Sequence, residues 1–260
     1  MMLILLVLFA AICMFGIRVS LDFREDYLSP ANTNCIKGIF VGLVFISHVV
    51  QYVMLENSYL DKSFDLIMGI LGQNIVIAFL LYSGFGIGEA IKKKGEIYVE
   101  RIPKHRIFKT WLQFLLILLM FIMLNLCLVH NKYSPVQYFL SLFALQSIGN
   151  STWFVFAILV CWGCSWIAFR ACKMDYVKSV WLLILLLVLY IIVIKEIKSG
   201  HCWYDTILCY PLGMIVSFNM EKINDRLFKK NIITLLIIVG SGSWMILRVF
   251  IEKNIFLYEI

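Results

Sequence analysis

Long runs of apolar residues, separated by short polar connectors, constrain this chain more than any other feature of its sequence. Several runs approach or exceed about 17 residues, the length that an α-helix needs to cross roughly 30 Å of hydrocarbon. Hydrophobic residues make up 62% of the 260 positions and charged residues 15%, which is too apolar for a water-soluble domain. The runs also lack the alternation of a membrane β-barrel. The sequence therefore predicts an all-α, polytopic transmembrane helical bundle that forms a single membrane-embedded domain over residues 1–260.

Eight of the runs are expected to span the membrane, at about 2–18, 36–54, 66–88, 107–129, 152–170, 180–195, 202–219 and 231–250. The apolar stretch 136–148 covers only about 20 Å as a helix, so we expect it to be re-entrant or interfacial. This arrangement places most of the 23 Lys and Arg on one side, whereas counting 136–148 as a span divides them more evenly. The positive-inside rule then puts both termini outside and the polar loop 89–106 in the cytoplasm.

Charge and cysteine content point away from other classes of protein. The net charge of +7 is concentrated in short connectors beside apolar runs, where basic residues set topology, so no nucleic-acid partner is expected. The 8 cysteines lie mostly in or beside apolar runs, as free buried thiols do. The pair Cys161-x-x-Cys164 has no second pair or basic context, so we predict no metal site.

His48 is the residue most suggestive of chemistry. It is the one plainly ionisable side chain deep within its apolar run, and an ionisable group inside a membrane is expensive and marks a functional site by default. Surrounding hydrocarbon favours the neutral imidazole, which is the form required of a general base. The alternative is a histidine that bonds between helices for structure, or that lies at the outer headgroups.

Basic residues on the cytoplasmic side could bind an anionic donor. Lys37 precedes His48 by 11 residues, about 16 Å at helical rise, although a lysine there can also be a snorkelling anchor. The 89–106 loop carries Arg101, Lys104 and Arg106 among other cations. Such clusters bind phosphate groups, but the same charges also set topology and attract anionic lipids.

Three further motifs have ordinary structural explanations. Glycines follow Ser83 at alternate positions, 84, 86 and 88, and small residues in an apolar run favour close helix packing or a kink. Trp153 and Phe154 open a run, as residues of an interfacial aromatic belt do. Pro211 is expected to kink its helix, and such kinks often border cavities.

Taken in order, these motifs resemble the integral-membrane acyltransferase 3 family, the O-acetyltransferases of bacterial polysaccharides and related envelope molecules. The resemblance covers residues 34–220 and rests on Lys37-x10-His48, Ser83-Gly84, Arg101-x-x-Lys104, Trp153-Phe154 and Pro211–Met214. Lysine stands at positions 37 and 104 where many members have arginine, which loses bidentate phosphate geometry. Members also continue through roughly two more spans, so the carboxyl-terminal spans usual in the family are expected to be missing.

The resemblance implies a multi-pass enzyme of the bacterial inner membrane that uses acetyl-CoA, or another acyl-CoA, as donor. It implies that His48 is catalytic, that Lys37, Arg101, Lys104 and Arg106 bind the donor, and that Ser83, Trp153 and Phe154 shape the substrate cavity. The implied partners are membrane lipids and a carbohydrate or glycolipid acceptor, with homo-oligomerisation left open. No metal is implied.

Three alternatives stay open. The chain could be a truncated paralogue that binds donor without turnover, or a transporter of an envelope intermediate, although inverted repeats typical of transporters are not visible. It could also resemble the membrane half of some amino-acid racemases, but no soluble catalytic domain follows the apolar runs. The sequence identifies neither the acceptor nor the length of the acyl chain.

Overall fold

The computed structural model describes residues 2–15, 26–49, 59–198 and 200–225. Every regular element in these ranges is a helix, which confirms the all-α prediction. Five of these helices are long and apolar enough to cross a membrane: Pro30–Val49, Asp61–Lys94, Glu96–Val129, Trp153–Ala171 and Tyr176–Ile197. The apolar helices Met2–Met14 and Cys209–Phe218 are shorter, and the predicted span at 231–250 lies outside the described residues.

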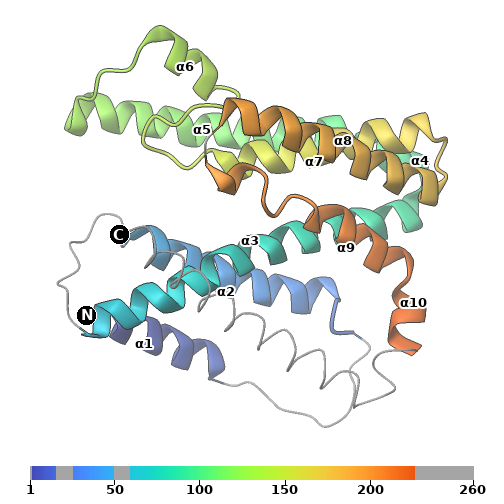
Figure 1. Cartoon of the computed structure of the whole chain (residues 1–260), viewed down its shortest axis with the longest axis horizontal. Helices are drawn as coiled ribbons and strands as arrows, with labels where there is room; N and C mark the ends of the chain where they lie inside the picture. The colour runs from blue at the N-terminus through green and yellow to red at the C-terminus, as the bar shows by residue number, and fades with distance from the viewer. Residues whose placement is uncertain (1, 16–25, 50–58, 199, 226–260) are drawn as a thin grey trace, which may run out of the picture. The chain divides into compact units, whose positions relative to one another are not determined.

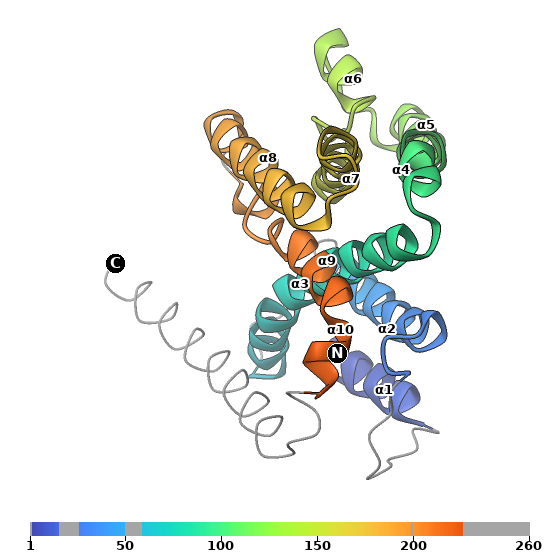
Figure 2. The same ribbon diagram turned by 90° about the vertical axis from the view of Figure 1, so that its right-hand side faces the viewer.

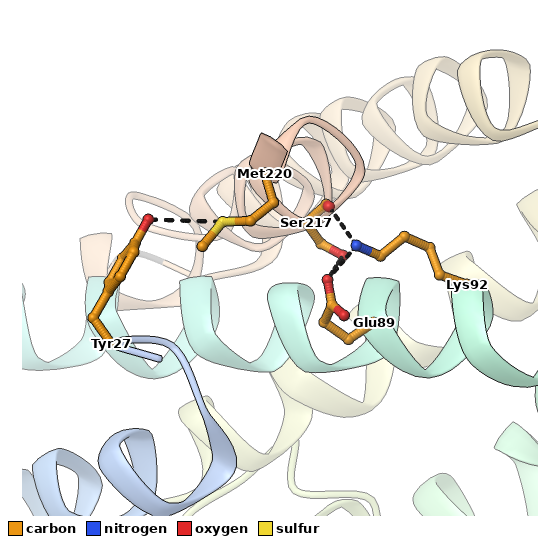
Figure 3. A network of polar contacts seen from close by, with 5 residues as sticks. All are labelled: Tyr27, Glu89, Lys92, Ser217 and Met220. Carbon is orange, nitrogen blue, oxygen red and sulfur yellow. Dashed lines mark hydrogen bonds and ion pairs between the residues drawn. The ribbon is translucent and has the colours of Figure 1, made fainter. Parts of the chain in front are cut away.

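The chain divides into two compact units, the first of which comprises residues 1–79 and 219–260. Its described elements are α1 (Met2–Met14), α2 (Pro30–Val49), the first part of α3 (Tyr59–Lys94) and α10 (Met220–Ile223). Its apolar core consists of Met2, Leu6, Ile46, Phe64 and Met68. The Tyr27 hydroxyl donates to Asn224 Oδ1 at 3.0 Å and lies 3.7 Å from Met220 Sδ, which ties α10 to the segment before α2 (Figure 3).

The second unit, residues 80–218, contains the rest of α3 and every element from α4 to α9. These are α4 (Glu96–Ile102), η2 (Pro103–Phe108), α5 (Lys109–Leu124), η3 (Asn125–Val129), α6 (Pro135–Ser141), α7 (Trp153–Ala171), α8 (Tyr176–Ile197), η4 (His201–Trp203) and α9 (Cys209–Phe218). In this unit α7 packs against α8 on one side and against α4 and η2 on another (Figure 2).

Glycines let α3 and α9 cross with their backbones in contact. A Cβ atom added at Gly84 would lie 1.9 Å from the Tyr210 carbonyl oxygen, and one at Gly213 would lie 2.0 Å from the Leu81 carbonyl oxygen. One turn further on, a Cβ at Gly88 would lie 2.7 Å from Ser217 Oγ. No side chain fits at these contacts, so the interpretation of the Ser83–Gly88 stretch as a helix-packing surface is confirmed.

The 136–148 stretch is only partly helical, because α6 has 7 residues and ends at Ser141. At helical rise α6 covers about 10 Å, far less than a bilayer. A capping box at Ser134 and Gln137 starts it, and the chain then turns back along α5. The Trp111 indole donates to the Leu142 carbonyl at 2.8 Å, and Ala144 and Ile148 pack with residues of α5.

Two local predictions were wrong. Residues 89–106 are helical rather than a loop, apart from a turn at Gly95 with a left-handed φ of 58°. Val99 and Ile102 are fully buried on α4, which packs on α7, while its charged side chains face away. The mean hydropathy of the segment is therefore low, and it does not show that the segment is a helix with one buried side.

Pro211 lies in the first turn of α9 and does not kink it, because a first-turn residue needs no N–H.

Candidate functional site

His48 lies in the last described turn of α2 and is half-buried. Ile46, two residues earlier, belongs to the apolar core of its unit, and Val49 packs against that core. The imidazole is therefore carried by an apolar helix whose end is fixed by packing.

Lys37 and His48 lie on the same face of α2. Eleven residues correspond to three turns plus about 20°, and to about 16 Å along the axis. Both side chains are half-buried, at the boundary between the packed and exposed sides of the helix. The structure thus places a cation and an imidazole on one apolar helix.

The three other predicted donor-binding residues lie together in the second unit. Arg101 is on α4, Lys104 and Arg106 are on η2, and all three are exposed. Arg106 Nε donates to the Tyr98 hydroxyl at 3.2 Å, which holds its guanidinium along the helix surface. Arg101 and Lys104 are three positions apart and lie on one side of the helix, so they can contact oxygens of one phosphorylated ligand, and we call these two residues the basic face. Arg106, two positions after Lys104, lies on a different side.

Lys92 has a structural role instead. Its ammonium forms an ion pair with Glu89 and donates to the Ser217 carbonyl at 2.7 Å (Figure 3). The Ser217 hydroxyl in turn donates to Glu89 Oε1 at 2.9 Å. Because Ser217 is in the last turn of α9, Lys92 satisfies a carbonyl that has no partner within its own helix. This network fastens α9 to α3 beyond the glycine crossing.

The predicted cavity residues are only partly brought together. Ser83 accepts a hydrogen bond at 3.2 Å from the indole of Trp162, not from Trp153. Trp162 follows Trp153 by nine residues of α7, about 13 Å along the helix. Trp153 and Phe154 begin α7 as predicted, and their rings contact each other with centroids 5.8 Å apart.

A second polar contact in the same region was not anticipated. The Ser165 hydroxyl donates to the Cys161 carbonyl at 2.8 Å and accepts from the fully buried Tyr210 hydroxyl at 2.9 Å. Both polar contacts therefore fall on the middle of α7, toward α3 and α9. Trp162 and Tyr210 have no local signal as site residues, because an aromatic residue in an apolar run is typical of a membrane core.

Comparisons with models of protein families, with curated proteins and with solved structures each found no match. A search of the described ranges also found no group of three or more His, Cys, Asp or Glu placed to hold a metal ion. The ionisable residues of α2 and of the basic face are therefore the starting point for a functional assignment.

Proposed function

We propose that this chain is a membrane O-acyltransferase. It transfers an acyl group, in the simplest case acetyl, from acyl-CoA on the cytoplasmic side to a hydroxyl of an envelope glycan or of its lipid-linked precursor. The observation that carries the proposal is the alignment of Lys37 and His48 on one face of α2, about 16 Å apart. An elongated donor with phosphates at one end and a thioester at the other fits that spacing. The corresponding location is the inner membrane of a bacterium.

His48 supplies the acid–base chemistry in this proposal. Its neutral imidazole takes the proton of the acceptor hydroxyl while that oxygen attacks the thioester carbonyl. The new C–O bond forms, the C–S bond breaks, and the coenzyme A thiolate receives the proton from the imidazolium. Transient transfer of the acyl group to His48 itself is the alternative route and uses the same residue.

The cations hold the donor in this scheme. Lys37 contacts the phosphates of the donor through a charge-assisted hydrogen bond, and the same role is proposed separately, from the resemblance, for Arg101, Lys104 and Arg106. The arginines can do so with two parallel bonds, which a lysine cannot. Ser83 would bind the acyl end or the acceptor through its hydroxyl, whose oxygen already accepts from Trp162. Trp153 and Phe154 would shape an apolar wall at the start of α7, about 13 Å along the helix from the contact of Ser83 with Trp162.

The experiment is acyl transfer from radiolabelled acetyl-CoA in membranes that contain the wild type, His48→Ala or His130→Asn at matched expression. His130 is an exposed histidine with a left-handed backbone, which asparagine tolerates, so that variant controls for loss of a histidine. We expect label in envelope material with the wild type and His130→Asn, and none with His48→Ala. A wild type that binds coenzyme A without transferring label would favour the non-catalytic paralogue. Failure to bind coenzyme A would favour the transporter.

A further inference from the structure

Arg106 lies on the packing side of its helix rather than on the basic face. Val99 and Ile102 are fully buried on α4. Arg106 follows them by seven and four positions, and residues at these spacings share one side of a helix. Its side chain is nevertheless exposed, so the guanidinium is accessible to a ligand. Arg106 therefore places a charge in line with an apolar packing surface.

The helix that carries Arg106 runs alongside α7, which is long and apolar enough to cross a membrane (Figure 1). A Cβ at Gly163 of α7 would lie 4.0 Å from Ile107 Cδ1, so Arg106 is at about the level of Gly163. Gly163 precedes Ala171, the last residue of α7, by eight positions, which is about 12 Å. If α7 spans the bilayer, the backbone of Arg106 lies within the depth of the hydrocarbon.

An arginine at that depth is expensive and is by default part of a functional site. Within the described ranges, no carboxylate forms an ion pair with Arg106. Its Nε donates instead to the Tyr98 hydroxyl at 3.2 Å, and both residues are close enough to the Tyr210 hydroxyl to interact with it electrostatically. The partners of Arg106 are thus neutral hydroxyl groups, which leave its charge available to an anion.

The backbone at Arg106 is irregular as well. η2 is a π-helix that begins at Pro103, and π-helical segments within α-helices are frequent at functional sites. Helical side chains lean toward the N-terminus, and Arg106 reaches back to Tyr98, eight positions earlier. A guanidinium bonded through Nε keeps its terminal N–H groups for a ligand, and the hydroxyl that accepts this bond keeps its own proton to donate. Tyr98 and Arg106 can therefore donate to one anion together.

We propose that Tyr98 and Arg106 form a phosphate-binding site, separate from the basic face, which a cytoplasmic ligand reaches below the membrane surface. Arg106 binds the phosphate through its terminal N–H fork, and Tyr98 positions the guanidinium and donates its O–H to the same group. The several oxygens of a phosphate suit these donors better than the two of a carboxylate. The nearer end of α7 is assigned to the cytoplasm from its cations Arg170, Lys173 and Lys178. That the phosphate belongs to acyl-CoA rests on the proposed function, whereas the site itself does not.

Binding of coenzyme A to the purified full chain in phosphatidylcholine nanodiscs tests the site without requiring turnover. Tyr98→Phe removes the hydroxyl and keeps the ring, whereas Arg106→Lys keeps the charge and removes the N–H fork. Each substitution should raise the Kd of coenzyme A about tenfold, as expected for the loss of one hydrogen bond to a charged group. The double variant should raise it by clearly less than the about hundredfold of two independent contacts. A full hundredfold increase would overturn the positioning role of Tyr98.

Two conservative substitutions outside the site are the matched controls. Tyr176 is exposed, and Tyr176→Phe keeps the ring that stacks on Phe218 with centroids 4.7 Å apart. Arg170→Lys keeps a cation beside the Trp166 ring. Neither should change the Kd of coenzyme A. Unfolding by sodium dodecyl sulfate checks that each variant is folded, and a purely structural role of Tyr98 would lower the unfolding midpoint while leaving that Kd unchanged.

A second arm separates the donor from a lipid as the source of the phosphate. Phosphatidylglycerol is added to the nanodiscs, and the lipid bound to the protein is counted by native mass spectrometry. Loss of bound phosphatidylglycerol in Tyr98→Phe and Arg106→Lys, with the Kd of coenzyme A unchanged, would support the site and overturn its assignment to the donor. Unchanged binding of both ligands would overturn the site itself. Binding of coenzyme A that depends on both residues, in a wild type that transfers no acetyl group, would remove the proposed function and support the site.

Discussion

The contact between α3 and α9 gives the sharpest structural prediction, through Gly213→Ala. The new methyl group would lie 2.0 Å from the Leu81 carbonyl oxygen and 2.8 Å from the Phe85 amide nitrogen, both backbone atoms. Because neither can rotate away, the helices must separate by more than about 1 Å to restore van der Waals distance. Such overpacking typically costs about 1–3 kcal/mol, and the higher helix propensity of alanine offsets at most about 1 kcal/mol. We expect a net loss of about 1–2 kcal/mol.

Gly86→Ala is the matched control on the same pair of helices. A Cβ at Gly86 meets nothing within 4 Å, so only the propensity gain remains, and the variant should be as stable as the wild type or up to about 1 kcal/mol more stable. The assay is unfolding by sodium dodecyl sulfate in mixed micelles, followed by tryptophan fluorescence and far-ultraviolet circular dichroism. Equal stability of Gly213→Ala and the wild type, or equal destabilisation by both substitutions, would refute the crossing.

Three further predictions concern single contacts and use the same unfolding assay. Lys92→Met leaves the Glu89 carboxylate and a carbonyl of α9 without their cation, so it should cost about 1 kcal/mol, whereas Lys93→Met at an exposed position should change nothing. Trp162→Phe removes a hydrogen bond to a serine of α3 and should cost about 1 kcal/mol; an unchanged midpoint would contradict that contact. Hydrogen bonds from Lys178, first of all its backbone N–H, lower the pKa of the Asp175 carboxyl at the start of α8. A lowered folded-state pKa means that the stabilisation is present above the unfolded value of about 4 and disappears as pH falls through the folded value. Stability measured against pH should therefore fall less steeply on the acid side in Asp175→Asn than in the wild type.

The features that the sequence predicted correctly are those that depend on the length of the apolar runs and on the positions of small residues. Helical class follows from run length, because backbone groups in lipid must bond within their own segment. The start of α7 at Trp153 and the tight packing at Gly84 and Gly88 were also readable. Small residues alone do not decide a contact, however. In the similar pair Gly38-x-x-x-Gly42, a Cβ at Gly42 would meet the Phe9 ring, but one at Gly38 meets nothing within 4 Å in the described chain.

What the sequence did not predict depends on partners distant along the chain. The pairing of Ser83 with Trp162 spans 79 positions and that of Lys92 with Ser217 spans 125, and no local pattern specifies either one. The helix at 96–108 was missed because its apolar positions are few and its charges many, so only packing on α7 shows that the pattern is amphipathic. The return of 142–150 along α5 is likewise a property of packing.

The central claim is that an acyl group enters from the cytoplasm and leaves on an acceptor across the membrane, and sidedness tests it most directly. Sealed membrane vesicles of both orientations, containing the wild type or His48→Ala, are supplied externally with radiolabelled acetyl-CoA, which does not cross the bilayer. The account predicts label on luminal envelope material in inverted vesicles with the wild type only, and none in right-side-out vesicles until they are permeabilised. Equal labelling in both orientations, or labelling that persists with His48→Ala, would contradict it.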